Sequence, residues 1–232
     1  MNEITYRIAR FIGETGEGSN RQFDVEVGAK AKYSPDNPYE VANEIVALRL
    51  GLALGLPIPI GGASRDQDKL YYISIHPAVE SLPKATDADI ASILENEKLA
   101  CGIIAFDSWI LNQDRWRRNI SYLDGETFIF DHGRALFAGQ RKEIEKNRSK
   151  ISIGSHCLKD GLKSLAWFEF WHKRILMLPE RFVRDSVELG TTLGCRVAKL
   201  SSWQTSFWTG ANDSQVFFEM GEAMCFQAWT KG

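Results

Sequence analysis

The sequence lacks the features that mark secreted, zinc-binding or membrane-spanning proteins. Its four cysteines lie far apart with no C-x-x-C spacing, which argues against a zinc knuckle or a disulfide scaffold and predicts reduced thiols. No basic and then apolar leader is present, and the most apolar run, IVALRLGLALGLPIPIGGA, is interrupted by Arg49 and two prolines. We therefore expect a cytoplasmic protein without a membrane partner.

The sequence also lacks an excess of charge of either sign. A net charge of −2 supplies no general attraction for nucleic acid or an anionic membrane. Internal repeats and low-complexity tracts are missing as well. The 232 residues are enough for one sizeable domain or for two small lobes that share a cleft.

Alternation of apolar and polar residues predicts strands in the first third of the chain. Residues 23–33 (FDVEVGAKAKY) alternate as a half-buried strand does, which places Lys30 and Lys32 on the same polar face. A second strand is predicted within KLYYISIHP, residues 69–77.

A helix is predicted between these strands. Asn37 is a good N-cap, Pro38 suits the first helical position, Glu40 completes a capping box, and Gly55 marks the end. Glu44 falls at the edge of the apolar stripe of this helix. Since burial of an unpaired charge is costly, we expect Glu44 to have a cationic partner.

The rest of the chain is predicted to be mainly helical. A helix begins at an N-cap, Thr86, and runs toward Leu111, and the charged segment 138–150 is predicted to be an exposed loop or helix. We place the boundary between a β-rich part, residues 1–80, and a helical part, residues 81–232, near residue 80. Further helices are predicted at 162–177, 179–193 and 213–229.

The segment 112–133, NQDRWRRNISYLDGETFIFDHG, carries the polar residues with the clearest spacing. Asp124-Gly125 is a tight-turn signal, and the strands on either side can pair as a hairpin. If the loop has three residues, Asn119 lies opposite Asp131, whereas a two-residue loop shifts this register by one. In the first case an amide oxygen and a carboxylate converge on a point that a small cation can occupy.

This spacing is typical of phosphoryl-transfer sites of the protein-kinase type. Such sites have an aspartate, an asparagine five positions later, and a second aspartate after a hairpin. Asp114, Asn119 and Asp131 show this spacing. Taken singly, each of these residues is more commonly a cap or a turn residue. The whole arrangement predicts a kinase-type site.

Three segments together resemble the HipA-like kinases, a branch of the protein-kinase and phosphatidylinositol-kinase-like fold. They are FDSWILNQDRWRRN (106–119), FDHGRAL (130–136), and GAKAKYSPDNPYEVANEIVALRLGLALGLPIP (28–59). The resemblance implies an α+β, two-lobed fold with a small β-rich lobe over a mainly helical one. It also implies an enzyme that uses ATP and Mg²⁺ to phosphorylate Ser or Thr of a protein, as toxin-type kinases do.

The resemblance assigns roles to individual residues. Asp114 matches the catalytic base, and Asn119 and Asp131 match the Mg²⁺ ligands. Lys30 is the best match to the phosphate-contacting lysine because its distance to Glu44, its ion-pair partner, fits the family spacing. Lys32, on the same face, is the alternative.

Residues 13–22, GETGEGSNRQ, resemble the family's phosphate loop. In this interpretation the backbone near Gly16 and Gly18, with Ser19 or Asn20, approaches the nucleotide phosphates. The same residues are also typical of a plain hairpin turn.

Two departures from the family pattern leave other functions open. Trp116 stands where many relatives have a histidine that supports the catalytic loop, and the chain is short, which leaves room for an antitoxin-like protein partner. The alternatives are a nucleotide-binding pseudokinase that acts as a regulatory module, and a small-molecule or lipid kinase. His132 follows Asp131 directly, but no second ligand lies three or four positions away, so zinc is not expected.

Overall fold

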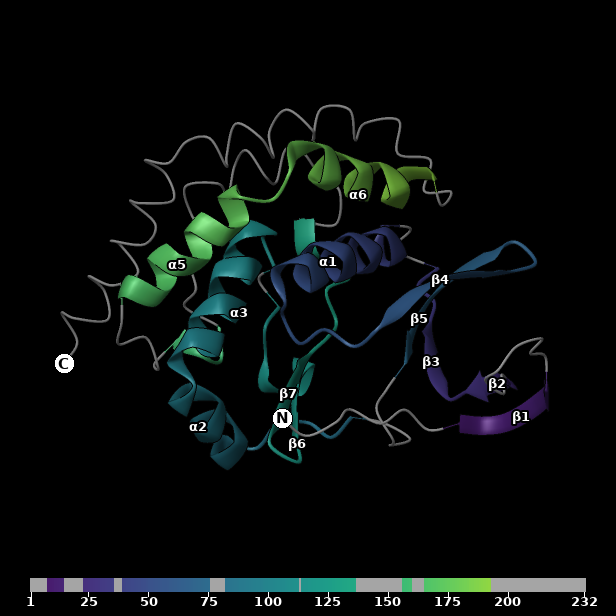
Figure 1. Cartoon of the computed structure of the whole chain (residues 1–232), viewed down its shortest axis with the longest axis horizontal. Coiled ribbons are helices and arrows are strands. Elements are labelled where there is room, and N and C mark those ends of the chain that lie inside the picture. Colours follow the sequence, from purple (N-terminus) through teal and green to yellow (C-terminus); the bar gives the residue numbers. More distant parts are fainter. Residues whose placement is uncertain are drawn as a thin grey trace.

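The fold mixes helices with small antiparallel sheets. The computed structural model describes residues 8–14, 23–35, 39–75, 82–112, 114–136, 156–159 and 165–192. Figure 1 shows the helices gathered on one side and most strands on the other, with helix α1 between them. The helix predicted at 213–229 and the charged segment 138–150 lie outside the described residues.

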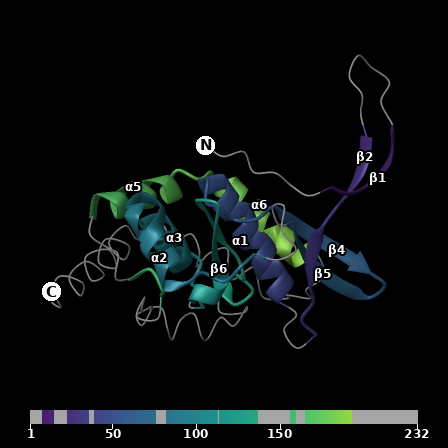
Figure 2. The same ribbon diagram turned by 90° about the horizontal axis from the view of Figure 1, so that it is seen from below.

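Two of the sheets come from the first third of the chain. Strand β1 (Ile8–Glu14) pairs with β2 (Phe23–Val27), and these two strands extend away from the rest of the molecule in Figure 2. A second sheet has the order β3-β5-β4, formed by β3 (Ala29–Lys32), β4 (Gly61–Asp66) and β5 (Lys69–Ile75). The strand predicted at 69–77 is therefore confirmed as β5.

The prediction of a single strand over 23–33 is wrong. The chain divides at Gly28 into β2 and β3, which belong to different sheets. Glycine has no side chain to pack in a sheet and often marks a bend between strands.

Helix α1 (Glu40–Leu54) is the central helix of the fold. Its predicted end is confirmed: Gly55 adopts a left-handed conformation with φ of 75°, and its N–H donates to the carbonyls of Gly51 and Leu52. The helix begins later than predicted, with Tyr39 at the N-cap position and no side-chain cap bond. Asn37 and Pro38 lie outside the described residues.

The helix predicted from Thr86 toward Leu111 is two helices, α2 (Asp87–Glu95) and α3 (Glu97–Trp109). The N-cap predicted at Thr86 is confirmed, and it forms a capping box, since Thr86 and Asp89 exchange hydrogen bonds with each other's backbone N–H. Asn96 separates the helices, and its side chain accepts from the N–H of Leu99 at 3.2 Å to cap α3. Asparagine competes with the helical backbone in this way, which explains the break.

A short 3₁₀ helix, η1 (Arg117–Asn119), leads into the hairpin of β6 (Ile120–Leu123) and β7 (Glu126–Ile129). The helices α5 (Leu165–Leu176) and α6 (Glu180–Thr192) fall within two predicted ranges. Helix α5 packs on α3 and α6 on α1, so the two central helices are covered by the two later ones (Figure 1). Among the described residues, no helix is long and apolar enough to cross a bilayer.

Candidate active site

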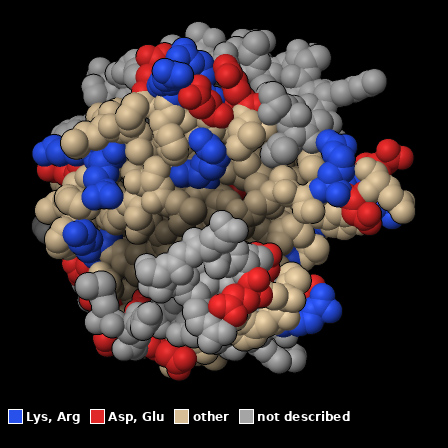
Figure 3. Space-filling model, turned by 45° about the vertical axis from the view of Figure 1, so that its right-hand side comes forward, with Lys and Arg blue, Asp and Glu red and all other residues tan. Residues whose placement is uncertain are grey.

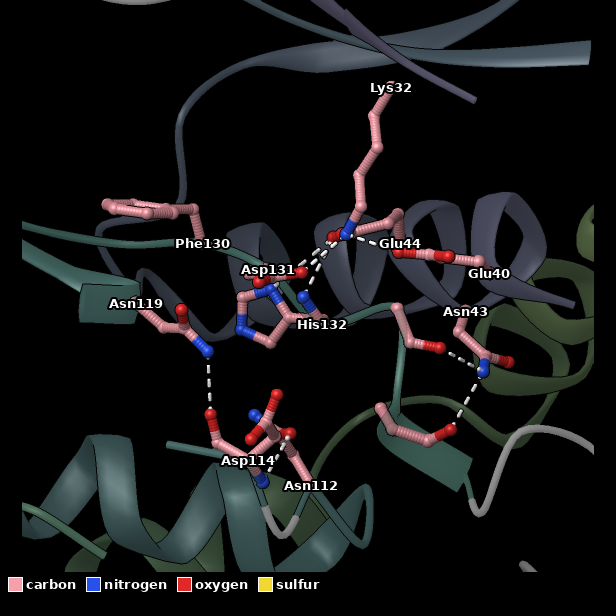
Figure 4. Close-up of polar contacts among 12 residues, drawn as sticks. Lys32, Glu40, Asn43, Glu44, Asn112, Asp114, Asn119, Phe130, Asp131 and His132 are labelled. Carbon is pink, nitrogen blue, oxygen red and sulfur yellow. Dashed lines mark hydrogen bonds and ion pairs between the residues drawn. The ribbon is translucent and has the colours of Figure 1, made fainter. Parts of the chain in front are cut away.

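Lys32, at the end of β3, forms ion pairs with three carboxylates. Its Nζ lies 3.0 Å from Glu44 Oε1 and 2.6 Å from Glu40 Oε1, and it also contacts Asp131 Oδ1. Burial by itself would lower the pKa of Lys32, but Glu44, Asp131 and Glu40 outweigh this effect and raise that pKa above its ordinary value. Figure 4 shows the lysine reaching from its strand to this group of oxygens.

The lysine that pairs with Glu44 is therefore Lys32 and not Lys30, the residue that the family spacing favours. Lys30 is exposed, two positions earlier on the same strand. Each residue of a strand advances the chain by roughly 3.3 Å, so two residues on one face differ by about 7 Å in reach. The strand register, which pairs Lys32 with Tyr72 and Lys30 with Ser74, decides between them.

Glu44 links this lysine to the loop that carries Asp131. Only 2% of the glutamate is exposed. Its Oε1 accepts a hydrogen bond from Lys32, and its Oε2 accepts one from the backbone N–H of His132 at 2.9 Å. Burial tends to raise the pKa of Glu44, yet the hydrogen bonds from His132 and the charge of Lys32 hold it below its ordinary value. The expectation that Glu44 needs a cationic partner is met by Lys32.

Helix α1 also holds the residues that follow Asp131. Asn43 Nδ2 donates to the carbonyls of Gly133 and Ala135, both at 2.8 Å. Gly133 lies so close to Glu40 that a Cβ there would be 2.3 Å from Glu40 Cγ. Asp131 itself adopts a left-handed conformation with φ of 63°, a strained backbone state that surrounding contacts must maintain.

The hairpin register differs from the one that places Asn119 opposite Asp131. Leu123 pairs with Glu126 and Ile120 with Ile129, so the loop has two residues, and Phe130 N–H donates to the Asn119 carbonyl at 3.2 Å. The loop residues Asp124 and Gly125 have φ of 52° and 86°, the positive values of a tight hairpin turn. Asn119 is thus opposite Phe130, one position before Asp131.

Asp114 and Asn119 are joined by a side-chain contact. Asn119 Nδ2 donates to the Asp114 carbonyl at 2.7 Å, and the Asp114 N–H donates to Asn112 Oδ1 at 3.3 Å. The Asp114 carboxylate lies 3.7 Å from Arg118 and 3.9 Å from Arg134, and the side chains of both arginines are more than half exposed. In Figure 4 Asp114 and Asn112 lie below Asp131 and Asn119 lies to the left, with the Asn119 oxygen turned away from the bond to Asp114.

The residues available to a metal ion suit Mg²⁺. Asn119 offers an amide oxygen, whose orientation its Nδ2 bond determines, and Asp131 offers a carboxylate. In phosphate-binding sites Mg²⁺ usually takes only one or two protein oxygens, with phosphates and water completing the octahedron. Within the described residues, no group of three His, Cys, Asp or Glu side chains is arranged to bind a metal.

Arg115 is a residue of this site that sequence reasoning missed. It is 1% exposed and lies between Asp114 and Trp116, which is 48% exposed. Its guanidinium contacts the side chain of Asp107 and the backbone carbonyls of Asn119 and Phe130. A charged residue between two motif positions gives no sign in the sequence of which way it points.

Part of the prediction lies outside the described residues. This applies to the loop residues Gly16, Gly18, Ser19 and Asn20.

Figure 3 shows a hollow on one face of the molecule, where the described Lys, Arg, Asp and Glu are interspersed around mostly uncharged surface.

Neither a family model nor a curated protein sequence matches the chain. Among solved structures, similar chains include a kinase and a component of a toxin–antitoxin system. The first is the proinflammatory kinase CtkA of Helicobacter pylori, with 13% identity, a TM-score of 0.42, and coverage of 83% of this chain and 94% of that chain. The second belongs to the complex of HipA, HipB and operator DNA from Shewanella oneidensis MR-1, with 8% identity and a TM-score of 0.44.

The match to the Shewanella complex covers 96% of this chain and 66% of the other. HipA gives its name to the family that the sequence motifs resemble. Both identities and both TM-scores are low, so neither structure transfers an activity, a substrate or a partner to this chain.

Proposed function

We propose that this chain is an ATP- and Mg²⁺-dependent kinase that transfers the γ-phosphoryl group of ATP to a hydroxyl. One observation carries the proposal: Lys32 from β3, Glu44 from α1 and Asp131 after β7 meet at one ammonium group, beside the linked pair Asp114 and Asn119. In keeping with the motif resemblance, the proposed acceptor is Ser or Thr of a protein.

The proposed roles follow from charge and position. Lys32, kept protonated by its carboxylate partners, would contact the nucleotide phosphates, and Glu44 would hold it in place. Asp114 would orient the acceptor hydroxyl and accept its proton. Asn119 and Asp131 would hold Mg²⁺, which offsets the negative charge of the phosphates.

The proposed nucleotide position implies two lobes. Lys32 and Glu44 belong to residues 1–80, whereas Asp114, Asn119 and Asp131 belong to residues 81–232. ATP would lie between these two parts, because its phosphates would have to contact both sets of residues.

The proposed activity is tested by transfer of radiolabel from γ-labelled ATP with Mg²⁺, both to the protein itself and to dephosphorylated casein. We expect Asp131→Ala to incorporate at least ~100-fold less label, because electrostatic stabilisation of the transferred group is the main source of catalysis in such sites. Asp185→Ala, at an exposed position on α6, is the matched control and should equal wild type. Equal labelling by wild type and Asp131→Ala would end the proposal.

The pseudokinase alternative is distinguished by the same proteins. It predicts a rise in melting temperature with ATP and Mg²⁺ but no label transfer under any condition. Trp116 motivated this alternative, but its side chain is half exposed, and the buried residue that supports the loop is Arg115. The presence of Trp116 in place of a histidine therefore does not remove that support.

A further inference from the structure

Arg115 uses every hydrogen-bond donor of its side chain. Nε and one N–H of Nη2 donate to Asp107, at 2.7 and 3.0 Å. Nη1 donates to the carbonyls of Asn119 and Phe130, at 2.8 and 2.7 Å, and Nη2 donates to His132 Nε2 at 2.7 Å. A guanidinium has five such donors, so the side chain is completely satisfied although it is buried.

The acceptors lie in the two segments that carry the proposed Mg²⁺ ligands. Asn119 is itself one ligand, and Phe130 and His132 stand on either side of the other, Asp131. Because Nη1 alone bonds to both segments, a single planar group determines their separation.

The other end of the guanidinium is anchored on helix α3 through Asp107, which is 1% exposed. Asp107 also accepts from Asn112 Nδ2 at 2.9 Å and lies 3.2 Å from His156 Nε2. His156 Nδ1 accepts from the Leu158 N–H, so its proton is on Nε2 and points at Asp107. The carboxylate is therefore held from several sides.

His132 continues the contacts toward helix α1. Arg115 can only donate, so His132 Nε2 accepts and the ring proton is on Nδ1, 3.8 Å from Glu44 Oε2. Glu44 in turn binds Lys32. The buried residues thus connect α3 to the lysine on β3.

We propose that Arg115, anchored by Asp107, is a positioning residue that sets the separation of Asn119 and Asp131. The inference rests on the proposed function, since it concerns the same site. The inference goes beyond the proposed function because it assigns the geometry of the metal ligands to a residue that touches neither metal nor substrate. A purely structural role would require only that the volume and charge of Arg115 be kept.

The test replaces Arg115 by lysine, which keeps the charge and most of the length but loses the planar fork. Arg49→Lys is the matched control, since Arg49 is a partly buried arginine on α1 that bonds Ser186 and lies over the Phe182 ring. Binding of Mn²⁺ in the presence of a non-hydrolysable ATP analogue is measured by electron paramagnetic resonance, with folding followed by circular dichroism.

We expect folded Arg115→Lys to bind Mn²⁺ about 10- to 100-fold more weakly, as is typical when a partner behind a metal ligand is removed. Its kcat should fall by a similar factor, while KM for ATP changes less than about threefold, because the nucleotide contacts of Lys32 are kept. Arg49→Lys should match wild type in all three quantities.

Asp107→Asn provides a second variant should Arg115→Lys fail to fold. It leaves Arg115 present but less firmly anchored, and we expect weaker Mn²⁺ binding in the same direction. Wild-type Mn²⁺ affinity in the folded variants would overturn the inference and leave the proposed function intact. A wild-type protein that binds no Mn²⁺ with the analogue and transfers no phosphate would overturn both.

Discussion

At the scale of single residues, the carboxylates around Lys32 determine its charge and its position. Three acidic side chains approach one ammonium group, and two of them, Glu40 and Glu44, are one helical turn apart on α1. Residues four apart lie on the same helix face, so the helix presents both to the strand. This concentration of negative charge keeps Lys32 protonated and aimed at Asp131.

At this scale we predict that Lys32 and Lys30 differ in importance despite their shared strand face. Lys32→Met should lower kcat/KM for ATP by roughly 10²- to 10³-fold, because it removes a preorganised positive charge. Lys30→Met, the matched control, should stay within about twofold. Steady-state phosphotransfer assays on the two folded variants check this, and the reverse pattern would assign the phosphate contact to Lys30.

At the scale of elements, the position of α1 is decided by polar contacts as well as by its apolar faces. Asn43 and Glu44 bind backbone groups of residues 132–135, so three hydrogen bonds join the helix to the loop after β7. Helix α3 is fixed in turn by α5 through a close contact: a Cβ on Gly102 would lie 2.4 Å from Trp171 Cε2. Trp171 Nε1 donates to the Lys98 carbonyl at 2.6 Å, so the indole cannot move aside freely.

We therefore predict that Gly102→Ala destabilises the protein. In an open helix, alanine would gain about 1 kcal/mol over glycine, but here overpacking should cost roughly 1–3 kcal/mol in free energy of unfolding. Gly62→Ala is the control, because a Cβ there meets no atom within 4 Å. Urea denaturation of both variants measures the difference, and a more stable Gly102→Ala would contradict this account of the α3–α5 contact.

At the scale of the whole molecule, stability depends on a buried ion pair between Asp107 on α3 and Arg115 in the segment 114–119. Burial tends to raise the pKa of Asp107, but the charge and hydrogen bonds of Arg115, with a bond from His156, hold it well below its ordinary value of 3.8. As the pH falls, the unfolded chain protonates at this carboxyl before the folded protein does. The stability that ionised Asp107 supplies is thus fully present above about pH 4 and is progressively lost below it.

The variant Asp107→Asn should separate the stability supplied by ionised Asp107 from that supplied by the other carboxyl groups. At pH 7 we expect the variant to be about 3–5 kcal/mol less stable, because Arg115 is left without its buried partner. Between pH 5 and pH 3, wild type should lose more free energy of unfolding than the variant, by about 1 kcal/mol. Chemical denaturation over this range checks the sign, with Asp185→Asn as an exposed control; parallel curves for wild type and Asp107→Asn would refute the assignment.

Features governed by short-range interactions could be predicted from the sequence alone. The N-cap at Thr86, the end of α1 at Gly55 and the turn at Asp124-Gly125 each depend on residues within about five positions. Local hydrogen bonds and backbone preferences decide such features. The spacing of Asp114, Asn119 and Asp131 was readable for the same reason, since one short segment and its hairpin contain all three.

Tertiary structure decided the contacts that join distant segments. Lys32 and Asp131 are 99 positions apart, and Asn43 and Ala135 are 92 apart. The choice of Lys32 over Lys30 depends on strand register against β5, and the burial of Arg115 depends on acceptors from α3 and both sides of the hairpin. The sequence determined which chemical groups are available, but only long-range packing, which no local preference encodes, determined which of them meet.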